Sequence, residues 1–554
     1  RYPPVVPRIS SKREVIISLL VSPPGTQPFS TEKIDDSIYI KTINNNLLPI
    51  LQEVVKCEDL YSVNPKVSAH ELFMILPELK KYISKDPEVT NNKMSRAGNE
   101  SYDPLVQLVD WLEKEFEATL QQIKNMIDKN EISFNNLWYI FPVATQVYAE
   151  IHEKISGARV TNCEYQTCFG IQYFVVNCEN IDSNGHGFIN SFKSWTIPYF
   201  IGVSDIENLP VVPLPKECAI RDELVKRGRK FETLAIGSHY MRYEGKFFKT
   251  SWFGPTYFKG DGRMMIDATT FSQINPNYNM GMANNNRRFY RIGGRNMHGQ
   301  NDTSSQNKVK EDELYMCSPT FFGFSFFAKK WGQFYVDQVY EIEFDDDAFN
   351  ELIMDANKKK IIKSLVNSEI IGLDLISGKG GGCIFLLHGP PGVGKTLTAE
   401  AISEYLHRPL YAVSVGELGV TPKELEDQLG RILEVASAWD AVILIDEVDI
   451  FLEQRSKNDI NRNALVGIFL RLLEYHQGIL FLTTNRVECF DKAFHSRLSI
   501  VLKYEELDEL ARAQVWRTFL DRADGKDKSQ VDIEKLKKRQ MNGREIKTAV
   551  RMAK

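Results

Sequence analysis

The 554-residue sequence lacks any apolar run of the roughly 20 residues that a helix needs to cross a bilayer. The longest run near its start, residues 15–21, has the length of a strand. A strong charge of one sign is also lacking, because 68 Lys and Arg residues against 73 Asp and Glu residues leave a net charge of −5. This balance provides no general attraction to nucleic acid or anionic lipid. We therefore expect no membrane span, and the charge argues against a nucleic-acid partner.

Cysteine is scarce as well. Eight cysteines in a chain of this length form no regular framework, so we interpret them as the reduced thiols of an intracellular protein, most simply a cytoplasmic one. Cys163 and Cys168 are a close pair, but no second pair of ligands lies near them in the sequence, so we expect no metal there. Because the sequence begins with Arg1 and not with Met, a nuclear or organellar location stays open.

An eight-residue motif in the last third of the chain predicts a nucleoside triphosphate site. It consists of Gly389, Pro390, Pro391, Gly392, Val393, Gly394, Lys395 and Thr396. An apolar, strand-like run over residues 383–387 precedes it, and a helical segment follows. Its glycines let backbone N–H groups approach phosphate oxygens. Lys395 can reach the β- and γ-phosphates, Thr396 can ligate Mg²⁺, and the following helix presents its positive end to the anion. We predict that the chain binds ATP with Mg²⁺.

A second motif predicts hydrolysis. Residues 441–445 form a continuous apolar run, typical of a parallel strand buried on both faces, and Asp446 and Glu447 follow it. Buried carboxylates are costly without a counter-ion, and Mg²⁺ with ATP would provide one. Asp446 would hold the coordination shell of the metal, and Glu447 would act as general base toward the attacking water. The alternative is a strand that merely leaves the core through acidic residues, and the preceding phosphate loop argues against it.

A third apolar run, residues 479–483, is followed by Thr484, Asn485 and Arg486. Asn485 could orient the lytic water or contact the γ-phosphate, although an Asn at the end of a strand is also common in turns.

The order of these motifs resembles that of the AAA ATPases, the ring-forming P-loop enzymes of the AAA+ superfamily. The corresponding segments are Walker A at 389–396, Walker B at 443–447, sensor 1 at 482–486 and the start of a sensor-2 helix at 542–545. The resemblance covers residues 349–554. Segments 227–231, 262–267, 462–465, 483–486 and 542–544 resemble a group of mostly fungal AAA proteins that carry a large uncharacterised amino-terminal region.

This resemblance implies an active site between the subunits of a hexameric ring. Arg497 would reach into the neighbouring subunit as an arginine finger, and Arg544 would contact the γ-phosphate of its own subunit from a small helical lid. Two features depart from the family pattern. The segment before Arg497 is short and leaves room for one finger only, and residues 416–423 contain no aromatic residue, which makes threading of a protein substrate doubtful.

The fold class that we predict is an α/β P-loop module, with a parallel five-stranded sheet and a helical lid, behind a mixed α and β-rich amino-terminal region. The expected regions are 1–136, partly helical; 137–344, β-rich with a mobile insertion near 275–310; 345–504, the large ATPase domain; and 505–554, the lid, whose end could lie beyond this sequence. In the first region, a capping box at residues 68–71 and an apolar stripe over 105–127 predict two helices, the first interrupted by Pro77.

The leading functional hypothesis is a ring of subunits that hydrolyses ATP and remodels a protein partner recruited by the amino-terminal region. A nucleotide-gated scaffold with little turnover is an alternative, which the missing aromatic in residues 416–423 keeps open. A third hypothesis is an ATPase that acts on nucleic acid. It rests on Arg287, Arg288, Arg291 and Arg295, which interleave with Phe289 and Tyr290 as in single-strand binders.

Overall fold

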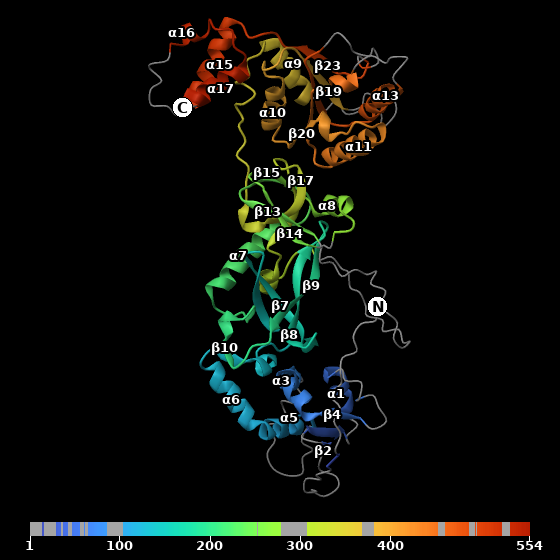
Figure 1. Cartoon of the computed structure of the whole chain (residues 1–554), viewed down its shortest axis with the longest axis vertical. Helices are drawn as coiled ribbons and strands as arrows, with labels where there is room; N and C mark the ends of the chain where they lie inside the picture. Colours follow the sequence, from blue (N-terminus) through green and yellow to red (C-terminus); the bar gives the residue numbers. More distant parts are fainter. Residues whose placement is uncertain are drawn as a thin grey trace. The chain divides into compact units, whose positions relative to one another are not determined.

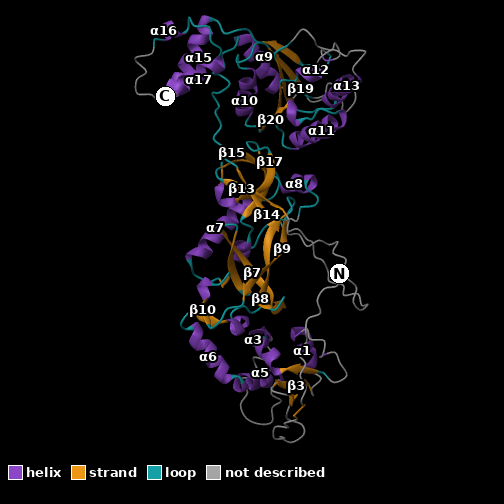
Figure 2. Ribbon diagram, in the orientation of Figure 1, coloured by secondary structure: helices purple, strands orange, loops and turns teal. Residues whose placement is uncertain are grey.

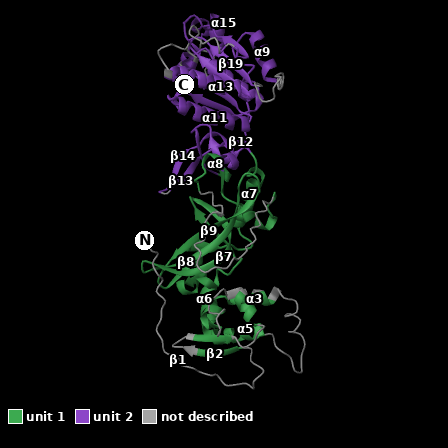
Figure 3. Cartoon of the chain, turned by 90° about the vertical axis from the view of Figure 1, so that its right-hand side faces the viewer, with its two compact units in different colours: residues 1–237, 272–321, 335–337 green, residues 238–271, 322–334, 338–554 purple. Residues whose placement is uncertain are grey.

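The computed structural model has two compact units that are interleaved along the chain (Figure 3). The first comprises residues 1–237, 272–321 and 335–337, and the second comprises residues 238–271, 322–334 and 338–554. The structure describes residues 14–15, 29–34, 37–42, 47–55, 60, 65–85, 104–251, 253–278, 307–367, 382–452, 460–486, 494, 496–522 and 532–553. Within these ranges, every helix is too short or too polar to span a bilayer.

Some of the predictions concern residues outside these described ranges. Most of the insertion expected near 275–310, with the arginines at 287–295, lies outside the described residues. The region boundaries expected after residues 136, 344 and 504 stay predictions.

The first unit begins with a small antiparallel sheet and a group of helices (Figure 1). Its strands, in their order across the sheet, are β1 (Glu14–Val15), β2 (Phe29–Ile34), β3 (Ser37–Thr42) and β4 (Lys66–Ser68). The helices are α1 (Leu47–Val55), α2 (Ala69–Met74), α3 (Leu76–Lys85), α5 (Pro104–Glu115) and α6 (Glu117–Ile127). Their apolar sides are buried in one core, as the helical spacing of Leu105, Leu108 and Leu112 predicts.

Two predictions about these helices are wrong. The stripe over residues 105–127 does not form one helix, because the chain leaves helical geometry at Phe116, with φ −103° and ψ 20°. The ring of Phe116 stacks on that of Phe73 at 4.3 Å between centroids. Ser68 is the N-cap of α2, but its side chain makes no capping hydrogen bond. The interruption expected from Pro77 is confirmed, since α2 and α3 are separate helices.

A five-stranded antiparallel sheet dominates the remainder of the first unit. Its strands are β6 (Gln146–Ile151), β7 (Lys154–Cys168), β8 (Ile171–Ser183), β9 (Phe188–Pro198) and β11 (Val211–Pro213), in the order β11-β6-β7-β8-β9. The unit also contains the pair β5 (Glu131–Ser133) and β10 (Val203–Asp205), the helix α7 (Ala219–Leu234) and the 3-10 turns η2 (Phe134–Tyr139), η3 (Ile206–Asn208) and η4 (Glu311–Met316).

The second unit contains a seven-stranded sheet before its ATPase module. The strands are β12 (His239–Tyr243), β13 (Lys246–Ser251), β14 (Gly254–Lys259), β15 (Gly262–Ile266), β16 (Thr320–Ser325), β17 (Lys330–Tyr335) and β18 (Val339–Tyr340). Their order is β14-β13-β17-β16-β15-β12-β18, and α8 (Ala268–Ile274) follows β15.

A five-stranded parallel sheet forms the centre of the ATPase module. Its strands are β19 (Cys383–His388), β20 (Leu410–Ser414), β21 (Val442–Asp446), β22 (Ile479–Thr484) and β23 (Ile500–Lys503), in the order β20-β21-β22-β19-β23, and all its paired neighbours run parallel. The helices α9 (Ala356–Asn367), α10 (Lys395–Leu406), α11 (Pro422–Ala438), α12 (Asp449–Leu452) and α13 (Ile460–Glu474) alternate with these strands (Figure 2). Continuous apolar strands of this kind need cover on both faces, and Phe385, Leu444 and Phe481 are accordingly buried. The predicted fold class is confirmed.

A small helical group ends the chain. It consists of α15 (Glu509–Arg522), α16 (Ile533–Leu536) and α17 (Gly543–Ala553), and it has a core of its own around Val515, Trp516, Ile546 and Val550.

Candidate nucleotide site

The phosphate-loop motif lies between β19 and α10, at the carboxyl edge of the parallel sheet. Gly389 and Gly392 have φ of 148° and 77°. A Cβ at Gly389 would lie 2.2 Å from the carbonyl oxygen of Tyr504, and one at Gly392 would lie 2.6 Å from Asn542 Oδ1. Only glycine fits these two positions. A Cβ at Gly394 would meet nothing within 4 Å, so the loop has open space there, as an approaching phosphate requires.

Lys395 joins the loop to the neighbouring strand. Its Nζ donates to the carbonyl oxygens of Gly389 at 2.7 Å and Pro390 at 2.8 Å, and to Asn485 Oδ1 at 2.8 Å. The side chain is buried, and this burial lowers the pKa of Lys395, while the charge of Asp446 acts in the opposite direction. All three acceptors are neutral, so among the described residues the ammonium hydrogen-bonds to no carboxylate and is suited to phosphate oxygens.

Asp446 lies beside the first turn of α10. Thr396 Oγ1 is 3.4 Å from each carboxylate oxygen of Asp446. A hydroxyl and a carboxylate are oxygen ligands of the type that Mg²⁺ prefers, and Mg²⁺ commonly takes one or two protein ligands together with substrate phosphates. In the described part of the chain, no group of three or more His, Cys, Asp and Glu side chains could hold a metal by itself. Thr396 and Asp446 therefore fit Mg²⁺ bound together with a phosphate.

Glu447 follows Asp446 in an unusual backbone conformation. Its φ is 59°, in the left-handed region that side chains other than glycine seldom adopt, and its side chain is exposed. Its N–H donates to Thr483 Oγ1 at 3.1 Å, and the same hydroxyl donates to Asp446 Oδ1. Thr483 thus fixes the end of β21, and backbone strain of this kind is often found at functional sites.

The start of the last helix, α17, contacts the phosphate loop. The Gly543 N–H donates to the carbonyl oxygen of Gly392 at 2.9 Å. Asn542 and Glu545 cap the helix reciprocally, each accepting from the backbone N–H of the other at 2.9 Å. Arg544 is exposed. Burial is the largest cause of the lowered pKa of Lys395, and the nearby positive charge of Arg544 lowers it further.

Arg497 lies at the opposite edge of the sheet. It donates to Glu474 at 3.0 Å, and Glu474 ends α13 just before β22 begins. The nearby Ser499 N–H donates to the carbonyl oxygen of Ile384, at the start of β19. The structure therefore brings together Lys395, Thr396, Asp446, Glu447 and Asn485, with Arg544 nearby, and places Arg497 apart from them within the same chain.

The sequence reasoning overlooked the supporting roles of Thr483, Tyr504 and Asn542. Tyr504 N donates to the carbonyl oxygen of His388 at 2.7 Å, and its hydroxyl lies 2.7 Å from Thr398 Oγ1 in α10. Burial raises the pKa of Tyr504 to about 12, so it stays a neutral phenol. The one feature of the sequence that could have indicated these roles is the position of Tyr504 directly after the last strand of the sheet.

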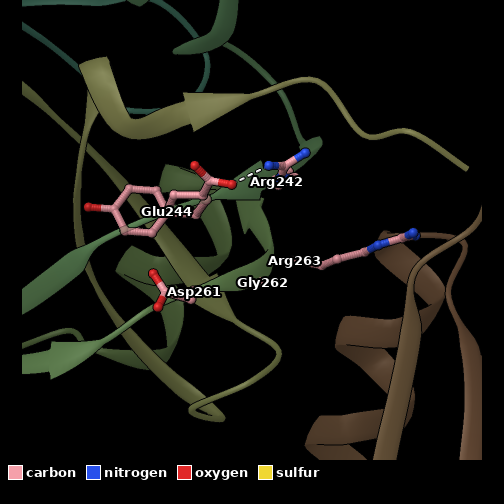
Figure 4. Close-up of a pocket in the computed structure, with 6 residues that line it drawn as sticks. Arg242, Glu244, Asp261, Gly262 and Arg263 are labelled. Atoms are coloured by element: carbon pink, nitrogen blue, oxygen red, sulfur yellow. Dashed lines mark hydrogen bonds and ion pairs between the residues drawn. The ribbon is translucent and has the colours of Figure 1, made fainter. Parts of the chain in front are cut away.

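A hollow of about 580 Å³ occurs elsewhere in the second unit, among the turns of the seven-stranded sheet (Figure 4). Its lining residues are Arg242, Tyr243, Glu244, Asp261, Gly262 and Arg263. Arg242 is paired with Glu244, and Asp261 accepts from the Gly245 N–H at 2.7 Å. It contains none of the residues predicted for nucleotide binding.

A parallel sheet with a glycine-rich loop between its first strand and helix, and an acidic residue at the end of a neighbouring strand, defines a P-loop nucleotide-binding domain. The family model described as "ATPase family associated with various cellular activities (AAA)" matches residues 385–506. Residues 385–506 therefore form an AAA ATPase domain within this chain. A second model, "Domain of unknown function (DUF7025)", matches residues 122–217.

Curated relatives match only part of the chain. An ATPase family AAA domain-containing protein 3A homolog from Drosophila melanogaster is 28% identical over 143 residues, 25% of this chain and 24% of the relative. A putative 26S proteasome regulatory subunit homolog from Methanothermobacter thermautotrophicus is 30% identical over 173 residues, 30% of this chain and 46% of the relative. The ATP-dependent zinc metalloprotease FtsH of Lachnoclostridium phytofermentans is 29% identical over 168 residues, 28% of each chain. The chain thus spans between about a quarter and a half of these relatives.

Proposed function

We propose that the chain is a Mg²⁺-dependent ATPase that hydrolyses ATP to ADP and phosphate. The observation that carries this proposal is the convergence of Lys395, Thr396, Asp446 and Asn485 at the carboxyl edge of three adjacent strands. Lys395 Nζ lies 2.8 Å from Asn485 Oδ1, and Thr396 Oγ1 lies 3.4 Å from Asp446. The match of residues 385–506 to the AAA ATPase family model supports the same reaction class.

Each residue of the site would have a separate role. Gly389–Thr396 would hold the phosphates through backbone N–H groups and the Lys395 ammonium. Thr396 and Asp446 would hold Mg²⁺, which supplies neutralisation of phosphate charge when it is bound. Glu447, with its exposed carboxylate, would take a proton from the attacking water, and Asn485 would orient that water.

Two arginines would complete the site. Arg544 is held near the loop by the contact between Gly543 and Gly392, so it could respond to the γ-phosphate of its own subunit. Arg497, at the other edge of the sheet, could reach only a neighbouring subunit, where its guanidinium would stabilise charge on the transferred phosphoryl group. This division of roles supports a ring of subunits, which we propose to be a hexamer.

We further propose that the ring remodels a protein partner recruited by the amino-terminal region, in the cytoplasm. The region contains substantial folded structure of its own, including the part that matches the second family model. Residues 416–423 contain no aromatic residue, and Glu417 is held in place by its capping of the 3-10 turn Val415–Glu417 and by its ion pair with Lys329. This supports a mode of action other than the gripping of substrate by a mobile aromatic loop.

Substitution Glu447→Gln tests this function. It keeps the size of the side chain but removes the base, so we expect the kcat for ATP to fall by about 100-fold or more while the Kd for ATP stays within about threefold. Steady-state phosphate release and binding of a fluorescent ATP analogue would measure both. Glu434→Gln, an exposed change on α11, is the matched control. A slow rate that Glu447→Gln leaves unchanged would favour the nucleotide-gated scaffold.

A further inference from the structure

The strand β15 of the seven-stranded sheet is joined to the ATPase module at its two ends. Arg263, near its start, extends away from the hollow shown in Figure 4 and donates to Glu404 Oε2 at 2.9 Å. Glu404 is in the last turn of α10. The guanidinium also lies over the rings of Phe344 and Tyr240, with its Cζ 4.9 and 5.6 Å from their centroids. Arg263 and Glu404 are both mostly buried, with side chains 27% and 23% exposed, so this pair is screened less than a surface ion pair.

Other contacts hold the same end of α10. The Asp345 N–H donates to Glu404 Oε2 at 3.2 Å, and the ring of Phe344 stacks on His407 at 4.3 Å between centroids. His407 is the C-cap of α10. The last turn of this helix is therefore contacted by Arg263, Phe344 and Asp345, all of which precede the parallel sheet in the sequence.

The contact of Arg263 with Glu404 is the first junction between β15 and the ATPase module, and the second is at Asp267, directly after β15. Its carboxylate is buried and accepts from Trp439 Nε1 at 2.7 Å, from Ser238 Oγ at 3.0 Å and from the Thr270 N–H and hydroxyl at 2.8 and 2.6 Å. A buried carboxylate with four donors is well satisfied, so its geometry is specific. Trp439 ends α11 as its C-cap.

An aromatic cluster surrounds this indole. Phe324 on β16, Phe326 in the turn between β16 and β17, and Trp331 on β17 have ring centroids 5.7, 5.8 and 5.5 Å from that of Trp439. Tyr411, on β20, stacks on Phe324 at 5.4 Å. The cluster adds apolar burial to the Asp267 hydrogen bond, so the sheet and the ATPase module share a packed interface.

Both junctions continue directly into the nucleotide site. The helix that Arg263 holds at its last turn begins with Lys395 and Thr396, and the segment that follows Trp439 leads into β21, which ends at Asp446. Helices and buried strands are stiff, so a displacement at one end moves the other. The two ends of β15 therefore contact the helix that begins with Lys395 and Thr396 and the segment that leads to Asp446.

We propose that Arg263 and Asp267 are positioning residues for ATP turnover, and that β15 fixes the relative placement of α10 and β21. This inference rests on the proposed ATPase function. Through it, a partner that strains the seven-stranded sheet would change the rate of turnover without touching the nucleotide.

The test compares Arg263→Ala, Arg263→Lys, Glu404→Gln and Trp439→Phe in the full chain. We expect Arg263→Ala to lower kcat about tenfold while the KM for ATP stays within about threefold, because phosphate contacts remain but their alignment with Asp446 is lost. Arg263→Lys keeps a cation opposite Glu404 and should recover part of the rate. Trp439→Phe keeps an aromatic ring in the cluster but removes the indole N–H that donates to Asp267, so its kcat should fall as well. Arg263→Ala combined with Glu404→Gln should be no slower than Arg263→Ala alone.

Arg242→Ala is the matched control. Arg242 lines the same hollow, but its ion-pair partner is Glu244 on its own side of the sheet, so its removal should leave kcat unchanged. Unchanged kcat in both Arg263→Ala and Trp439→Phe, or an equal loss in Arg242→Ala, would overturn the proposal. Should Arg263→Ala not fold, Glu404→Gln replaces it in the test, because it keeps the shape of the side chain but removes the charge that pairs with Arg263. A lowered kcat in Glu404→Gln would then support the proposal, and an unchanged kcat would overturn it.

Amide hydrogen exchange separates this proposal from the ATPase assignment. In nucleotide-free protein, peptides from residues 395–406 should exchange several-fold faster in Arg263→Ala than in Arg242→Ala. If the wild-type chain shows no turnover, the proposed function fails, and exchange alone then tests the junction. Equal exchange rates of residues 395–406 in Arg263→Ala and Arg242→Ala would refute the proposed role of Arg263 in holding α10.

Discussion

At the residue scale, one hydroxyl organises the carboxyl end of β21. Thr483 Oγ1 donates to the Asp446 carboxylate and accepts from the Glu447 N–H at 3.1 Å. Glu447 is held at φ 59°, a conformation that persists only when surrounding contacts impose it. Thr483 is therefore expected to orient Asp446 and Glu447 together, the residues that we propose as metal ligand and general base, although it has no direct contact with ATP or water in the proposed mechanism.

Substitution Thr483→Val tests this role. Valine has the shape of threonine without the hydroxyl, so the strand should pack normally while Asp446 and the backbone of Glu447 lose a common partner. We expect kcat to fall about 10- to 100-fold, as for other residues that support metal ligands, with little change in the melting temperature. Thr233→Val, which removes an exposed hydroxyl from α7, should leave turnover unchanged. Equal kcat in wild type and Thr483→Val would show that Glu447 is oriented by other contacts.

At the element scale, the contact between the phosphate loop and α17 determines which glycines are needed. Gly392 combines φ 77° with a Cβ position 2.6 Å from Asn542 Oδ1. We expect Gly392→Ala to weaken ATP binding by about tenfold or more, because the loop and the start of α17 must separate to admit a methyl group. Titration with a fluorescent ATP analogue would measure the loss.

Gly430→Ala provides the control for a glycine without such a constraint. Gly430 lies within α11, and a Cβ there would meet nothing within 4 Å. This substitution should raise the free energy of unfolding by about 0.5–1 kcal/mol and leave ATP affinity unchanged. Equal affinities of Gly392→Ala and wild type would contradict the tight contact between the loop and α17.

The elements also show what the sequence could predict. The strands of the parallel sheet were predictable because buried parallel strands are continuously apolar, and the loop, Asp446 and Asn485 follow directly from strand ends. The break between α5 and α6 at Phe116 could not be predicted from the sequence. It accompanies the stacking of Phe116 on Phe73, a contact between distant segments that helical periodicity does not reveal. The contacts of Thr483 and Tyr504 depend on the register of β22 and β23 with their neighbours, which a single sequence does not specify.

At the scale of the whole molecule, the position of Arg497 bears on assembly. It pairs with Glu474 near the amino edge of the parallel sheet, whereas Lys395, Asp446 and Asn485 lie at the carboxyl edge. A guanidinium at one edge cannot serve a site at the other edge of the same sheet. If Arg497 takes part in catalysis, the site that it serves must belong to another copy of the chain.

Mixing two inactive variants tests this arrangement. Arg497→Ala subunits keep Glu447, and Glu447→Gln subunits keep Arg497, so a ring that contains both has some interfaces with both residues intact. Random mixing at equal amounts should make about a quarter of the interfaces complete, because each half of an interface is intact with a probability of about one half. We expect phosphate release to reach up to about a quarter of the wild-type rate near a 1:1 ratio and to vanish toward either pure variant. Arg471→Ala, which removes an exposed pair of α13 with Glu426, should be active alone. Absence of activity at every ratio would mean that catalysis is not shared between subunits.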